Sequence, residues 1–131
     1  MKLITTLLPE LAILIFLIIT FGFSIIEKIA DWKGTISYIQ ENFKNTLIKN
    51  FIKPLIAFLV GLEILSSFFL TIGIYEILNS QEKQFALLGC VFSTISILYM
   101  LIGQRIAKDY PGATSLAVYF LISVFGIFLL N

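Results

Sequence analysis

Four long apolar segments, separated by shorter polar connections, restrict the fold of this chain more than any other feature. They cover residues 7–26, 55–78, 85–103 and 113–130. Each is close to the ~20 residues with which an α-helix crosses ~30 Å of hydrocarbon. The chain is 59% apolar, whereas a typical soluble domain is about 45–50% apolar. The sequence therefore predicts an all-α, polytopic membrane four-helix bundle that forms a single domain over residues 1–131.

The connection between the first two segments has a helical pattern of its own. Within residues 35–51, apolar side chains recur at three- and four-residue spacing: Ile36, Ile39, Phe43, Leu47 and Phe51. Charged and amide side chains occupy the other faces, which is typical of an amphipathic helix in the membrane interface. Trp32 stands where an interfacial anchor is expected. Two roles remain open for this helix: it rests on the bilayer, or it caps the bundle and controls access to its interior.

Basic residues are distributed unequally between the two sides of the predicted bundle. Seven of the nine Lys and Arg residues lie in the loops 27–53 and 104–112, whereas Lys2 and Lys83 lie on the other side. Loops rich in Lys and Arg remain on the cytoplasmic side of a membrane. We therefore expect a multi-pass protein of a bacterial inner membrane, with both basic loops in the cytoplasm and both termini outside.

The composition excludes several kinds of chemistry. The sequence has no histidine, so the usual ligand of a haem or of an imidazole-bound metal is missing. Cys90 is the single cysteine, which rules out an internal disulfide relay, and it is expected to be a small apolar filler. The net charge of +1 gives no basis for nucleic-acid binding. A redox reaction would therefore need a cofactor or a partner from elsewhere.

Glu63 is the most unusual residue, because it stands in the middle of the second apolar segment. A charged side chain at the bilayer centre costs roughly 2.5–3.5 kcal/mol on insertion scales, so it usually faces a bundle interior or a wet cavity. Glu63 follows Lys53 by ten residues, which is about 15 Å along a straight helix. Glu10 and Glu76, in contrast, lie near the outer ends of their segments, where we expect solvated carboxylates.

Polar residues on the cytoplasmic side can reach Glu63. Lys28 follows the first segment and Arg105 follows the third, and long basic side chains extend along apolar surface. Ser24 shares a helix face with Lys28 at four-residue spacing, and Gln104 adds an amide. The predicted ligand-binding site therefore consists of Ser24, Lys28, Glu63, Gln104 and Arg105, and we expect no catalytic residue and no metal ligand.

Three interpretations of this cluster remain open. In the first interpretation, the cluster is a structural ion pair that fixes the register of the helices. In the second interpretation, the cluster is a polar pocket for a quinone or another small ligand. Alternatively, Glu63 titrates in a small proton-coupled transporter, where a buried carboxylate exchanges a proton for a substrate.

Three features carry a resemblance to a known family. Residues 21–34 read FGFSIIEKIADWKG, residues 103–113 read GQRIAKDYPGA, and Glu63 is followed by Gly73 in the second segment. By the order and spacing of these features, the chain resembles the DoxX family of small four-helix membrane proteins over nearly its whole length.

The resemblance implies a role associated with redox chemistry. DoxX-like proteins are linked to membrane oxidoreductases, and related subunits belong to a thiosulfate:quinone oxidoreductase. Lys28 matches the basic residue after the first helix of the family, and Glu63 matches the acidic residue in the second. We expect a subunit without enzymatic activity of its own that binds a quinone-like or other small ligand, or docks a soluble or membrane oxidoreductase. Its other expected partners are the lipid bilayer and further copies of the chain.

Overall fold

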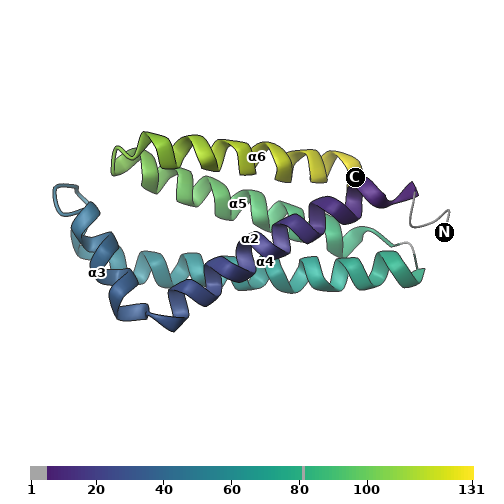
Figure 1. Cartoon of the computed structure of the whole chain (residues 1–131), viewed down its shortest axis with the longest axis horizontal. Helices are drawn as coiled ribbons and strands as arrows, with labels where there is room; N and C mark the ends of the chain where they lie inside the picture. The colour runs from purple at the N-terminus through teal and green to yellow at the C-terminus, as the bar shows by residue number, and fades with distance from the viewer. Residues whose placement is uncertain (1–5, 81) are drawn as a thin grey trace.

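The computed structural model describes residues 6–80 and 82–131, and within them the chain folds into helices (Figure 1). Their bounds are α2 Leu8–Ala30, α3 Trp32–Asn42, the short 3-10 helix η1 Lys49–Phe51, α4 Ile52–Ser80, α5 Gln84–Ile106 and α6 Tyr110–Leu130. Four helices are long and apolar enough to cross a membrane, with α4 continuing η1 in one of them. The predicted all-α fold with four spans of this kind is confirmed.

The long helices extend beyond the predicted segments mainly at one end of the bundle. α2 ends at Ala30 and α5 at Ile106, while α4 begins at Ile52 and α6 at Tyr110. All four of these helix ends lie beside α3, at what we call the α3 end of the bundle (Figure 1). The prediction counted apolar residues, whereas a helix continues through polar residues as long as its backbone hydrogen bonds continue.

The predicted interfacial amphipathic helix over residues 35–51 is wrong. α3 begins earlier, at Trp32, and ends at Asn42, and residues 43–48 form turns before η1. Thr46 closes the first turn, because its backbone N–H at 3.0 Å and its hydroxyl at 2.7 Å both donate to the carbonyl oxygen of Phe43. Threonine side chains compete with helical hydrogen bonds in this way. A single helix of the predicted length is therefore not formed.

α4, α5 and α6 lie side by side, and α2 packs across them (Figure 1). Near its beginning α2 contacts α6, where Ile13 lies against Gly126 and the rings of Phe16 and Tyr119 are 5.9 Å apart between centroids. Cys90 of α5 is buried against the same glycine. Towards the α3 end, α2 and α6 diverge, as Figure 1 shows.

Two aspartates begin the helices at the α3 end. The carboxylate of Asp31 accepts a hydrogen bond from the backbone N–H of Gly34 at 3.1 Å, and Asp109 accepts one from Gly112 at 3.2 Å. A Cβ atom at Gly34 would lie 2.2 Å from the Asp31 carboxylate, and one at Gly112 would lie 2.5 Å from that of Asp109. A larger residue at either glycine would therefore require the aspartate side chain to shift.

We expect Asp31→Ala to lower the free energy of unfolding by about 1 kcal/mol, which is typical for the loss of a helix N-cap. Asp31→Asn is the matched control, because its amide oxygen accepts the same hydrogen bond. Thermal unfolding of the detergent-solubilised protein, followed by circular dichroism, measures both. Equal losses in the two variants would show that the charge of Asp31 matters rather than the cap.

Candidate functional site

A buried ion pair joins α2 to α4. Glu63 is completely buried, and its Oε1 accepts a hydrogen bond from the ammonium of Lys28 at 3.0 Å. The same ammonium donates to the hydroxyl of Ser24, one helical turn earlier in α2. The four-residue spacing places Ser24 and Lys28 on one face of α2, directed at α4. The structure thus brings together three of the five predicted site residues.

The other two predicted residues lie at the end of α5, and they differ from each other. Gln104 lines a cleft at the α3 end, whereas the guanidinium of Arg105 lies over the ring of Tyr110, 5.2 Å from its centroid. Among the described residues, Lys28 is the cation that pairs with Glu63. The expected cluster of Glu63 with both cations is therefore wrong. Neighbouring residues on a helix point about 100° apart, so Gln104 and Arg105 face different surroundings.

A cleft of about 1120 Å³ opens at the α3 end, between the end of α2, α3, the start of α4 and the end of α5. Lys28 lines this cleft and Glu63 does not. The exposed fraction of the side chain is 16% for Lys28 and 0% for Glu63, in agreement with this order. Lys28 thus lies at the wall of the cleft, and the carboxylate of Glu63 holds its ammonium from a position outside the cleft lining.

The hydrogen bonds of the pair are incomplete. A lysine ammonium has three N–H donors, and Lys28 directs one to Glu63 and one to Ser24. Glu63 Oε2 is buried and has no hydrogen-bond partner within the described part of the chain. A buried polar group without a partner costs about 1–3 kcal/mol. The pair therefore retains one N–H donor on Lys28, which lines the cleft, and one acceptor oxygen on Glu63.

Three acidic residues line the same cleft as Lys28. They are Glu27, Asp31 and Asp109, and Lys28 is the basic residue among the described residues that line it. The sequence reasoning missed all three. The signal for the two aspartates was an Asp-x-x-Gly pattern that occurs once before α3 and once before α6.

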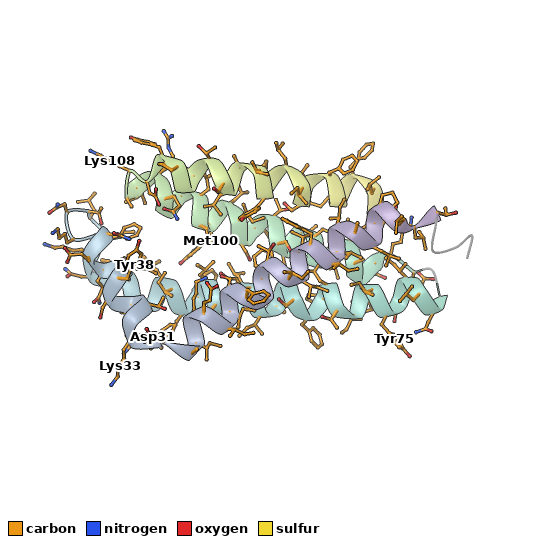
Figure 2. The ribbon with its side chains drawn as sticks, viewed as in Figure 1. Asp31, Lys33, Tyr38, Tyr75, Met100 and Lys108 are labelled. Atoms are coloured by element: carbon orange, nitrogen blue, oxygen red, sulfur yellow. The ribbon has the colours of Figure 1, made fainter. Side chains whose placement is uncertain are left out.

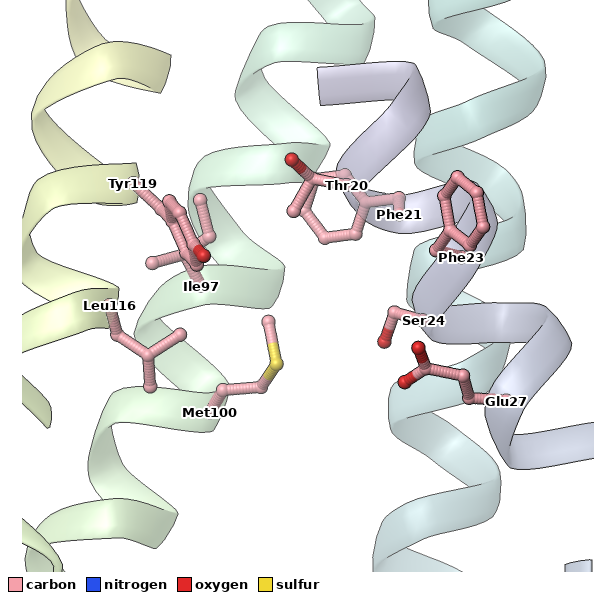
Figure 3. Close-up of a pocket in the computed structure, with 9 residues that line it drawn as sticks. All are labelled: Thr20, Phe21, Phe23, Ser24, Glu27, Ile97, Met100, Leu116 and Tyr119. Atoms are coloured by element: carbon pink, nitrogen blue, oxygen red, sulfur yellow. The ribbon is translucent and has the colours of Figure 1, made fainter. Parts of the chain in front are cut away.

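A smaller cavity of about 230 Å³ lies deeper in the bundle, between α2 on one side and α5 and α6 on the other (Figure 3). Ser24 lines it from α2, and Leu116 and Tyr119 line it from α6. Glu27 and Met100 line both the smaller cavity and the cleft. The two spaces are therefore neighbours that share a wall.

Glu10 was expected to be solvated, and this is wrong. Its exposed fraction is 8%, and its Oε2 has no hydrogen-bond partner within the part of the chain that the structure describes. Leu7, Leu11 and Leu130, which belong to the same core, lie at this end of the bundle. Glu10 is buried although it lies near the beginning of α2, because the end of α6 packs at the same end of the bundle.

Comparison of the chain with protein-family models, with curated proteins and with solved structures finds no match. The resemblance to the DoxX family rests on the stretches around Lys28, Glu63 and Gly103 alone.

Proposed function

We propose that this chain is a DoxX-like membrane subunit that binds a neutral, quinone-like ligand in the cleft at the α3 end. One observation carries the proposal. Lys28 is held by Glu63 and Ser24, and it keeps one N–H for an acceptor atom of the ligand. A carbonyl oxygen of a quinone is such an acceptor.

The charges around the cleft favour a neutral ligand. Glu63 already neutralises Lys28, and Glu27, Asp31 and Asp109 add negative charge to the wall. An anionic head group would be repelled by these carboxylates, because like charges repel one another. A carbonyl oxygen accepts the remaining hydrogen bond of Lys28 without bringing a second negative charge.

The size and the walls of the cleft support the same ligand class. Pockets for small molecules usually have volumes of ~300–1,000 Å³ and mostly apolar walls with a few polar groups. The cleft measures about 1120 Å³, and Phe43, Ile52 and Leu59 are among its apolar lining residues. Tyr99 lies in the same wall, although its hydroxyl donates to the carbonyl oxygen of Leu55 at 2.8 Å. A flat apolar ring with polar oxygens fits such a site.

The wider role is part of the same proposal. α3 and the turns after it form one wall of the cleft, so they cap this end of the bundle. With the basic loops in the cytoplasm of a bacterial cell, the cleft faces the cytoplasm and both termini lie outside. A ligand bound there is accessible to an oxidoreductase that docks on the α3 end. The chain then presents the quinone and leaves the electron transfer to its partner.

We expect the double variant Lys28→Met/Glu63→Leu to bind decylubiquinone at least about tenfold more weakly than the wild type. A hydrogen bond from a charged donor contributes about 1.5–3 kcal/mol, which corresponds to roughly 10–100-fold in affinity. The measurement is a calorimetric titration of the protein in lipid nanodiscs. Lys33→Met is the matched control, because Lys33 points away from the bundle (Figure 2). Equal affinity of the double variant and the wild type would refute the proposed site.

Proton-coupled transport is the alternative. It requires Glu63 to exchange protons with the substrate path, so Glu63→Gln would abolish pH-dependent substrate uptake into vesicles. The position of Glu63 behind Lys28 argues against direct contact with a substrate in the cleft. Quinone binding that persists in Glu63→Gln, together with unchanged uptake, would exclude the transporter.

A further inference from the structure

The smaller cavity lies at a depth where hydrocarbon surrounds the protein. Leu116 and Tyr119 follow Tyr110, the first residue of α6, by six and nine residues, which corresponds to roughly 9 and 14 Å along the helix. Ser24 and Thr20 precede the end of α2 by six and ten residues, and hence by about 9 and 15 Å. Since α6 is about as long as the hydrocarbon layer is thick, the cavity lies between the membrane surface and the midplane.

The cavity opens towards the outside of the bundle. Phe23 lines it and is 63% exposed, so one edge of the cavity reaches the outer face of α2. At this depth, that face meets acyl chains. The opening results from the divergence of α2 from α6 after their contact at Phe16 and Tyr119.

The lining of the cavity is mostly apolar, and two of its polar side chains, Thr20 and Ser24, are engaged in hydrogen bonds within the protein. The hydroxyl of Thr20 donates to the carbonyl oxygen of Phe16 at 2.8 Å, and the hydroxyl of Ser24 accepts from Lys28. Phe21, Ile97 and Leu116 supply apolar surface. Apolar cavities of ~150 Å³ hold a molecule of benzene, so 230 Å³ is enough for a branched hydrocarbon unit.

The cleft and the smaller cavity follow one another in the same order as the polar head group and the apolar tail of an amphiphile in a membrane. The cleft near the helix ends contains the ammonium of Lys28, and the smaller cavity lies deeper, beyond Glu27 and Met100. Figure 3 shows Met100 extending from α5 towards Glu27 and Ser24 of α2. A head group at Lys28 would place its tail past Met100 into the smaller cavity.

We infer that the ligand is a lipid-borne amphiphile with a hydrocarbon tail, and that the tail lies in the smaller cavity and leaves it past Phe23 into the bilayer. This inference rests on the proposed function, which requires only the head group in the cleft. It adds that the protein distinguishes tailed quinones from tail-less ones, and that the ligand reaches the site from the membrane. Burial of two methylene groups amounts to about tenfold in affinity.

Two probes with the same head group test the inference. Decylubiquinone carries a tail, and 2,3-dimethoxy-5-methyl-1,4-benzoquinone has none. We expect the wild type in nanodiscs to bind the tailed probe at least about tenfold more tightly, after correction for its partition into the lipid. Leu116→Trp fills the cavity and should reduce this ratio of affinities to near one.

Leu121→Trp is the matched control, because Leu121 lies on the same helix and is 67% exposed. It should keep the ratio of the wild type. Thr20→Phe fills the cavity from α2, and it decides the question if Leu116→Trp does not fold. A ratio near one in the wild type, or a ratio that neither cavity-filling variant changes, overturns the inference and indicates a lipid acyl chain in the cavity. If neither probe binds the wild type, the proposed function itself fails.

Discussion

Lys28→Met is expected to lower the free energy of unfolding by about 3–5 kcal/mol, the usual cost of removing one partner of a buried ion pair. The reason is the burial of Glu63, whose carboxylate has no exposed surface and no second partner within the described residues. Without Lys28 its charge is left uncompensated in an apolar bundle. Glu63→Gln should cost less, because Lys28 borders the cleft and water can reach its ammonium. Thermal unfolding in a mild detergent compares the two variants.

The double variant Lys28→Met/Glu63→Leu completes a double-mutant cycle. Replacement of both members of a buried ion pair by apolar residues is often neutral or stabilising. We therefore expect the double variant to be nearly as stable as the wild type, with a coupling energy of about 2–3 kcal/mol between the two positions. Additive losses in the two single variants would mean that the ion pair does not stabilise the fold, and would leave ligand binding as the reason for these residues.

The four long apolar helices and the ion pair were predictable because each depends on one kind of sequence signal. Apolar length predicts the four helices. The pairing of Lys28 with Glu63 follows from antiparallel helices that bring the end of α2 beside the first half of α4, where Lys28 is the cation within reach. Ser24 follows from the four-residue spacing on the same face.

The cleft was not predictable, because it depends on the angle at which α2 crosses the other helices. That angle is determined by contacts between distant residues, such as Ile13 with Gly126. The sequence also indicates which end of α5 Arg105 occupies, but the direction of its side chain depends on the rotation of the whole helix. For the same reason, the prediction placed Glu63 at the centre of a polar pocket, whereas Lys28 is the residue that faces the cleft.

The close packing of α4 against α5 is the second feature whose loss should have a large effect. A Cβ atom at Gly73 would lie 2.5 Å from the Cα atom of Ala86, and one at Gly89 would lie 2.8 Å from the backbone nitrogen of Leu70. Both contacts involve backbone atoms, which cannot move aside without separating the helices. Between helices in a lipid bilayer, such close approach provides much of the attraction, because apolar side chains gain little by leaving lipid.

Gly73→Ala is therefore expected to destabilise the bundle by about 1–3 kcal/mol, the usual cost of overpacking. Gly61→Ala is the matched control in the same helix, because a Cβ atom there has no neighbour within 4 Å. Its effect should be neutral or slightly stabilising, since alanine favours a helix over glycine by up to about 1 kcal/mol. Unfolding midpoints of the two variants in one detergent give the comparison. Similar midpoints would show that α4 and α5 can separate by the width of a methyl group at little cost, and the backbone contact at Ala86 would then contribute little to the stability of the bundle.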